Sequence, residues 1–141
     1  MSAPMTLSPR PPRPPLSRAV LAALAVFVAK RLATRSPARI EAIMRRLRVG
    51  ARPARYARAQ TAYDEVMAVS SWCRGPQGCL PRSIAVALLC RCSGTWPSWC
   101  VGARKVGPFS AHAWVEAQGR VVGERFGDDY FRTLFAVRPV P

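Results

Sequence analysis

The sequence predicts an α+β protein in which helices come first and an antiparallel sheet follows. Before about residue 92 the apolar residues recur at helical spacing, whereas residues 99–137 read as short strands with a hairpin-type turn. The 141 residues are one domain's length, and a hydrophobic content of 50% is enough to build a core. These observations exclude a wholly disordered chain. The absence of a repeating period excludes solenoid, collagen-like and coiled-coil classes.

Residues 1–16 predict a proline-rich, basic tail that stays extended or disordered. Ser17 is then expected to cap a helix that runs to about Ala33, apolar on most of its circumference and packed on several sides. Its apolar run, residues 19–29, is too short for a transmembrane segment and lacks the cleavage site of a signal peptide. Association or peripheral membrane contact through this helix stays open as an alternative.

Two more helices are predicted before residue 72. Ser36-Pro37 combines an N-cap oxygen with a proline at the first helical position, and an apolar stripe at i, i+3, i+4 and i+7 follows. A third helix spans roughly residues 54–71. We therefore expect a helical region over residues 17–71 and a catalytic part over residues 72–141, with 17–141 folding as one domain.

The pattern changes after Trp72. Residues 74–78 have the composition of a loop, and Cys79 opens a fourth helix that continues to about Cys92. Strands are expected at residues 99–106, 109–117 and 120–124, the last two joined by a turn at Gln118-Gly119. Residues 130–137 predict either another strand or a short helix.

Positive charge is concentrated in the first part of the chain. The net charge is +15, and residues 1–58 hold thirteen basic residues against one acid, whereas residues 59–141 hold nine against six. This asymmetry predicts an acidic partner for the N-terminal part. Nucleic-acid binding is an alternative, but no recognition motif accompanies the charge, so we expect no specific nucleic acid.

Cysteine usage indicates the compartment and argues against a metal site. The five cysteines form an odd number without framework spacing, which favours a reducing cytoplasm. A zinc site is a poor fit because the chain has no C-x-x-C pair and a single histidine. We expect neither a metal nor a cofactor.

The single histidine, His112, limits metal-free nucleophilic catalysis to a thiol or hydroxyl that lies beside it. Cys79 has the best setting, because a predicted helix N-terminus favours the thiolate and its free N–H groups can hold an oxyanion. Gly78 is expected to leave room for a substrate, and Arg82 adds positive potential. The other thiols are Cys90, Cys92 and Cys100, which read as core or filler, and Cys73, which stays possible in the loop.

An acid that orients His112 should come from the neighbouring strand. Alternation puts His112, Trp114 and Glu116 on one face, and Glu116 is expected to meet solvent or Arg120. Across the hairpin, position 112 lies opposite about position 125, and a bulge would bring Glu124 beside the imidazole. Two further acids, Asp128 and Asp129, come within reach if the chain curls back.

Two motifs carry a family resemblance. Cys79-Leu-Pro-Arg-Ser, and Ala111-His-Ala-Trp-Val-Glu with Gly119, together resemble the transglutaminase-like cysteine peptidases of lasso-peptide biosynthesis, the B-protein leader peptidases. The resemblance covers about residues 72–137. The length and the lack of a winged-helix leader-binding module make the chain look like the stand-alone peptidase half of a split B protein.

The resemblance implies a papain/transglutaminase-like core, with the nucleophile-bearing helix packed on a small antiparallel sheet. It implies that Cys79 is the nucleophile and His112 the base, with Glu124 where the family more usually has Asp, and Asp128 as the alternative acid. The reaction would remove the leader from a ribosomally made precursor. Implied partners are the precursor peptide, a separate leader-binding recognition-element protein and an ATP-dependent lasso cyclase.

Further residues enter as candidates on this basis. Backbone N–H groups at Cys79, with the Gln77 amide, would stabilise the oxyanion, and Arg82 and Trp114 are candidate substrate-binding residues. The same Cys-His-acid site also suits acyl or amide transfer, with an amine in place of water, and that reaction stays open.

Overall fold

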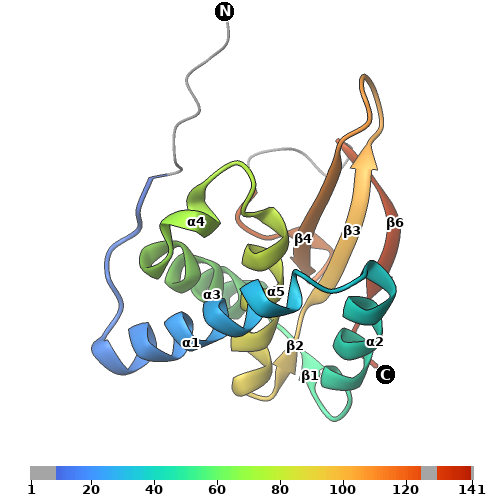
Figure 1. Ribbon diagram of the computed structural model, residues 1–141. Helices are drawn as coiled ribbons and strands as arrows, with labels where there is room; N and C mark the ends of the chain where they lie inside the picture. Colours follow the sequence, from blue (N-terminus) through green and yellow to red (C-terminus); the bar gives the residue numbers. More distant parts are fainter. Residues whose placement is uncertain (1–8, 125–129, 141) are drawn as a thin grey trace, which may run out of the picture.

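A computed structural model describes residues 9–124 and 130–140. Five helices and a small sheet form an α+β arrangement. This confirms the predicted fold class. The elements are α1 (Leu16–Leu32), α2 (Pro37–Leu47), β1 (Arg52–Pro53), α3 (Tyr56–Val69), α4 (Ser71–Arg74), α5 (Cys79–Cys92), β2 (Thr95–Trp96), β3 (Ser98–Arg104), β4 (Ala111–Ala117), β5 (Arg120–Val121) and β6 (Phe131–Val137). In Figure 1, α1, α3, α4 and α5 lie together on one side of the sheet, and α2 lies beside β6.

The main sheet has the strand order β5-β4-β3-β6, and every pair in it is antiparallel. The hairpin at Gln118-Gly119 is confirmed, since Ala117 pairs with Arg120. Residues 131–137 form a strand on the other side of β3, which decides between the two structures expected there. The two-residue strands β1 and β2 pair separately in parallel.

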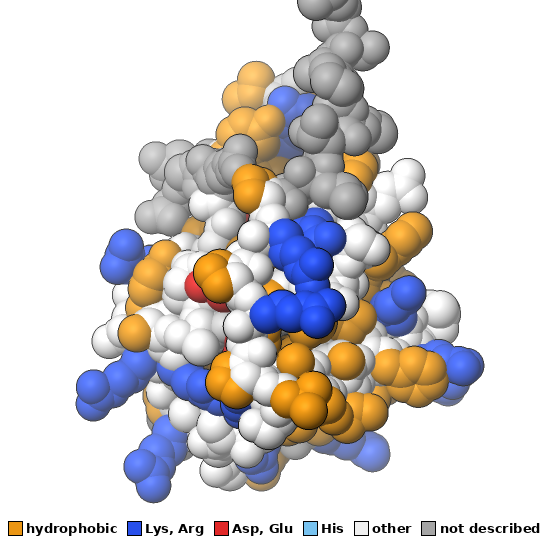
Figure 2. Space-filling view, turned by 90° about the vertical axis from the view of Figure 1, so that its left-hand side faces the viewer, with side chains coloured by type: hydrophobic (Ala, Val, Ile, Leu, Met, Phe, Trp, Pro, Cys, Tyr) orange, Lys and Arg blue, Asp and Glu red, His pale blue; other side chains and the backbone are white. Residues whose placement is uncertain are grey.

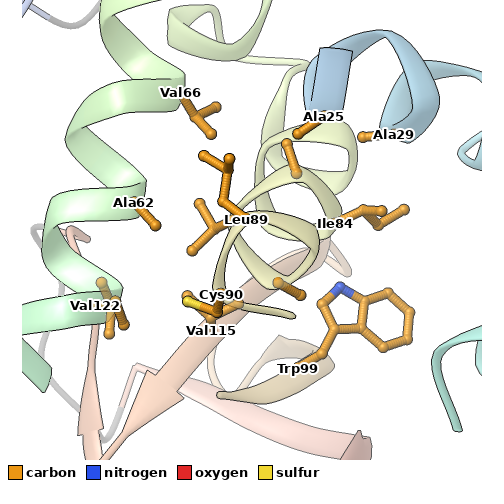
Figure 3. Close-up of a cluster of buried hydrophobic side chains, with 14 of the residues drawn as sticks. Ala25, Ala29, Ala62, Val66, Ile84, Leu89, Cys90, Trp99, Val115 and Val122 are labelled. Carbon is orange, nitrogen blue, oxygen red and sulfur yellow. The ribbon is translucent and has the colours of Figure 1, made fainter. Parts of the chain in front are cut away.

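Helix α5 lies at the centre of the core. It is buried along most of its length and packs against α1, α3 and β4. Figure 3 shows Ala25 and Ala29 of α1 on one side of it and Ala62 of α3 on another, with Trp99 and Val115 toward the sheet. The labelled members of this cluster are Ala25, Ala29, Ala62, Val66, Ile84, Leu89, Cys90, Trp99, Val115 and Val122. Small residues on α1 allow the close helix contact that holds α5 in place.

Two expectations for α1 are wrong. The helix begins at Leu16 with Pro15 as its N-cap, so Ser17 lies within its first turn and caps nothing. The helix also packs on one face only, through Ala22, Ala25, Val26 and Ala29, because α5 and α3 cover that face and none of the described residues covers the other. No helix in the described ranges is long and apolar enough to cross a membrane.

Other helix ends follow the sequence more closely. The Ser36 side chain accepts a hydrogen bond from the Arg39 N–H at 3.3 Å, and Pro37 begins α2, as predicted. Residues 75–78 form no helix or strand, as expected for the loop at 74–78. Arg74 and Cys73, both expected in the loop, instead lie in the short helix α4, which Ser70 caps. Of the expected N-terminal tail, residues 9–15 form no helix or strand, and Arg10 donates to the Ala68 carbonyl at 3.0 Å.

Candidate active site

Cys79 is the first residue of α5 and is half-buried. The N–H groups in the first turn of a helix have no partner within the helix, so those of Cys79 and Leu80 can donate hydrogen bonds to a negatively charged group nearby. Gly78 is the N-cap, and a Cβ at this position would collide with the backbone of α4, at Trp72 O and at 2.8 Å from Cys73 Cα. Its role is therefore the close approach of two helices, which corrects the expected role of leaving room for substrate.

His112 projects from β4 toward both Cys79 and an acid. Its Nε2 lies 3.5 Å from Glu124 Oε1, and its side chain is hydrogen-bonded to the Cys79 thiol. The imidazole stacks on Phe131 at a centroid distance of 4.7 Å and on Trp114 at 5.9 Å. Because Nε2 faces the carboxylate, Nδ1 is the nitrogen available to the sulfur.

Glu124 reaches His112 through an abrupt change of backbone direction after the β-hairpin. The Val122 N–H still donates to the Val115 carbonyl at 3.0 Å, in register with the hairpin. Gly123 then adopts a φ of 75°, where the chain leaves the extended conformation. The expected bulge is thus replaced by a left-handed glycine, while the expected closeness of Glu124 to His112 is found. Asp128 and Asp129 lie outside the described residues.

Arg82 is placed differently from the expectation of a substrate-binding residue. Its side chain is buried, and it donates to the Cys73 carbonyl at 2.8 Å and to Glu124 Oε1 at 3.1 Å. Both contacts are with the protein itself. Arg82 therefore fixes the carboxylate that faces His112, from one turn beyond Cys79 on the same helix.

The Trp114 ring is also buried, and its contacts are with side chains of the site. It stacks beside His112, and its Nε1 donates to Glu116 Oε2 at 2.8 Å. The same carboxylate oxygen lies 3.6 Å from Cys100 Sγ, so the half-buried Glu116 contacts side chains on its own face. The alternative partner, Arg120, instead lies over the Tyr56 ring at 4.1 Å. The expected shared face of His112, Trp114 and Glu116 is found.

Charges alternate along the chain of contacts from Arg82 through Glu124 and His112 to Cys79. Burial opposes ionisation of the Cys79 thiol, but hydrogen bonds from His112 and the Ala113 backbone outweigh it, so the pKa of the thiol is lowered. Burial lowers the pKa of His112, yet its contacts with Cys79 and Glu124 raise it to about 9. Burial raises the pKa of Glu124, whereas His112 and Arg82 lower it, with a net lowering. The lowered pKa of the thiol and the raised pKa of the imidazole both favour the thiolate–imidazolium pair over the neutral pair.

One contributor to this site has no signature in the sequence. The Ala113 N–H is hydrogen-bonded to the Cys79 sulfur, which stabilises the thiolate. This N–H is available because β5 pairs with β4 only at residues 116 and 117 and leaves the start of β4 uncovered on that side. Every residue type except proline supplies a backbone N–H, so the position has to be read from the pairing of strands.

The other four cysteine thiols lack the combination of a lowered pKa and contact with His112 that Cys79 has. Cys73 is fully buried, and burial raises the pKa of its thiol, as it does for Cys100 and for Cys90, whose pKa is about 11. Cys92 is exposed at the opposite end of α5. Within the described residues, Cys79 alone combines a lowered pKa with contact to His112. Nor do three or more His, Cys, Asp or Glu side chains gather into a metal site there.

A cleft of about 690 Å³ opens beside this group. His112, Gly123 and Glu124 line it together with residues of α3. The lining comprises Pro9, Pro11, Gln60, Tyr63, Asp64, Met67, Arg82, His112, Gly123, Glu124, Tyr130 and Phe131. Gln77 is exposed and lines separate hollows with Trp72, so its amide is not among the groups brought to this cleft.

Comparison with known proteins gives one match. The sequence profile described as "Transglutaminase-like superfamily" matches residues 22–136, which include the helical region as well as the strands. No curated protein and no solved structure matches the chain.

Proposed function

The chain belongs to the transglutaminase-like superfamily, which includes cysteine peptidases and transferases, and we propose that this member is a cysteine peptidase acting on a lasso-peptide precursor. In this proposal it removes the leader in the cytoplasm, together with a separate leader-binding protein. The freed amine of the core peptide is then the substrate of an ATP-dependent cyclase. The observation that carries the peptidase reaction is the Cys79–His112–Glu124 contact chain beside the cleft.

In the first step, the Cys79 thiolate attacks the scissile carbonyl and forms a C–S bond. The helix N-terminus of α5 offers N–H donors to the oxyanion of the tetrahedral intermediate. The His112 imidazolium then gives its proton to the departing amine as the C–N bond breaks. The raised pKa of His112 keeps this proton available at neutral pH.

In the second step, water hydrolyses the thioester. Neutral His112 takes a proton from the water, the new C–O bond forms, and the thiolate leaves as the C–S bond breaks. Glu124 accepts from the imidazole throughout and stabilises its charged form. Arg82 in turn holds Glu124 in place through the contact at 3.1 Å.

The cleft supports a peptide as the substrate. Aromatic side chains of Tyr63, Tyr130 and Phe131 line it together with the polar side chains of Gln60 and Asp64. Rings of this kind pack against peptide side chains, and the polar groups can bind backbone N–H and carbonyl groups.

Acyl or amide transfer is the second candidate, because the superfamily includes transferases and the thioester is common to both reactions. The cleft has a volume of about 690 Å³, which leaves space for an amine as well as for water. The two reactions differ only in the group that attacks the thioester.

The test is mass spectrometry of a leader–core precursor incubated with this protein and a leader-binding partner in heavy-oxygen water. Hydrolysis yields one cut at the leader–core junction with the heavy isotope in the new carboxylate. Transfer yields a new amide without the isotope. We expect Cys79→Ala and His112→Ala to abolish the cut and Cys92→Ala, a matched cysteine variant at the far end of α5, to retain it. A cut that survives Cys79→Ala contradicts the proposed nucleophile.

A further inference from the structure

The outer side of α1 presents an apolar stripe with no partner among the described residues. Leu16 is 81% exposed, Val20 51%, Leu24 57% and Phe27 59%. Their spacing of four, four and three residues places them along one line, and the stripe extends about 17 Å at the rise of an α-helix. Val28 is 44% exposed beside it. We call these five side chains the α1 face. A contiguous apolar surface on one element is the mark of an interaction site.

A groove adjoins the N-terminal end of the α1 face. It measures about 440 Å³, and its apolar lining includes Leu16, Ala19, Val20 and Val69. Arg10 and Arg13 also line it, and both are exposed. An apolar floor edged by two guanidinium groups fits a partner that offers apolar and acidic side chains together.

Charge around the α1 face is of one sign. Residues 9–40 contain seven basic residues and no acid. One of them, Arg18, is bound to Glu65 at 2.8 Å, and the others are exposed. At the C-terminal end of the stripe, Arg31 lies over the Phe27 ring at 5.2 Å, so cations stand at both ends of the apolar line. Figure 2 shows hydrophobic side chains low on this side of the molecule, where α1 begins in Figure 1, with Lys and Arg side chains beside them.

We propose that the α1 face binds an amphipathic helix of a partner protein. Its apolar side chains would pack against Val20, Leu24 and Phe27, and its Asp and Glu side chains would lie against the flanking cations. A straight apolar line at helical spacing is what one helix presents to another. The proposal stands independently of the reaction assigned to the Cys79 site.

Three other occupants fit these observations less well. A second copy of the chain would bring two strongly basic faces together, which like-charge repulsion opposes. Nucleic acid matches the positive charge, but binding through its phosphates would not bury the exposed side chains of Leu24 and Phe27. A bilayer would accept the apolar stripe and the cations, but it has no counterpart for a concave groove lined by two arginines.

The test uses a fluorescent amphipathic peptide of about 18 residues, long enough to form a helix, with Leu on one side and Glu along its flanks. Its binding to the full chain is followed by fluorescence anisotropy. We expect binding that Val20→Ser/Phe27→Ser weakens by about tenfold or more, that is by about 1.4 kcal/mol. The matched control Val106→Ser/Phe109→Ser alters residues that are 82% and 80% exposed outside α1, and it should leave binding unchanged.

Charge reversal provides the second arm. Lys30→Glu/Arg31→Glu should weaken binding of the Glu peptide. The same variant should strengthen binding of a peptide that has Lys in place of Glu. The proposal is overturned if the peptide fails to bind at about 1 mM, or if the α1 variants bind it as well as the unchanged protein does. It is equally overturned if phosphatidylcholine–phosphatidylserine vesicles bind where the peptide does not, or if sedimentation shows a dimer that Val20→Ser/Phe27→Ser dissociates.

Discussion

The guanidinium of Arg82 and the carboxylate of Glu124 form a buried ion pair, with Nη2 and Oε1 3.1 Å apart. The same oxygen lies 3.5 Å from His112 Nε2. Because Arg82 and Cys79 lie one turn apart on α5, a single helix carries the thiol and also the group that fixes the acid. Together with the thiolate and imidazolium, the four groups sum to no net charge, which lowers the cost of burying the ionised pair.

Removing the positive charge of Arg82 should both destabilise the fold and disturb the site. Arg82→Met leaves Glu124 buried without its arginine partner, so we expect a loss of about 3–5 kcal/mol in the free energy of unfolding. It should also raise the pKa of the Cys79 thiol, because the arginine charge contributes to lowering that pKa. Arg82→Lys keeps the charge and should recover part of both effects. Chemical denaturation measures the free energy of unfolding, and alkylation at several pH values measures the pKa of the Cys79 thiol. If neither quantity changes in Arg82→Met, the role of Arg82 in holding Glu124 is contradicted.

The rate of the reaction should follow a bell-shaped pH profile. The active form has a thiolate at Cys79 and a protonated His112. On the acid side, activity falls when the thiolate is protonated, below the ordinary thiol pKa of 9.0, because the pKa of Cys79 is lowered. On the alkaline side, activity falls as His112 loses its proton, at a pKa of about 9. Measuring kcat/KM across this range checks both limbs, and a rate that rises steadily above pH 9 disagrees with this assignment.

Gly123 should be intolerant of a side chain. Gly123→Ala places a Cβ 2.5 Å from the Tyr63 ring at a positive φ, so the chain has to move next to Glu124. We expect a strong loss of kcat and a destabilisation of about 1–3 kcal/mol. Gly119→Ala is the matched control, since it has a φ of +77° and open space around it. Equal effects of the two changes on kcat would show that the position of Glu124 is unimportant.

Cysteine alkylation at neutral pH should be selective. Brief treatment with iodoacetamide is expected to modify Cys79 first, then exposed Cys92, because the first thiol has a lowered pKa. The buried thiols of Cys73, Cys90 and Cys100 should react only on unfolding. Peptide mapping by mass spectrometry distinguishes the sites. Faster modification of Cys73 would return it to consideration as the nucleophile.

Local patterns predicted the parts of the fold that local chemistry determines. Ser36-Pro37 begins α2, Cys79 begins α5, and the Gln118-Gly119 turn sets the hairpin. The closeness of Glu124 to His112 followed from counting residues across that turn. Each of these depends on capping, periodicity or turn geometry within a short segment.

The features that the sequence did not predict depend on contacts between distant segments. Position 78 has to be glycine because the backbone of α4 lies against it, and residue spacing does not predict this contact. The partner of Arg82 lies 42 residues further along, and a buried arginine looks the same in sequence as one that binds substrate. The pattern of α1 showed an apolar helix but could not show that its neighbours cover one face only.

The ionisation of Cys79 tests the central claim most directly. The rate of iodoacetamide alkylation is measured against pH in a Cys92→Ser background, with and without His112→Asn. We expect the Cys79 thiol to titrate clearly below its ordinary pKa of 9.0 with His112 present and at a higher pH without it. The hydrogen bond and the charge of His112 are then lost, while burial, the Ala113 N–H and the Arg82 charge remain. A thiol that titrates at or above 9.0 with His112 in place, or that ignores its replacement, contradicts the assignment of this pair as the reactive centre.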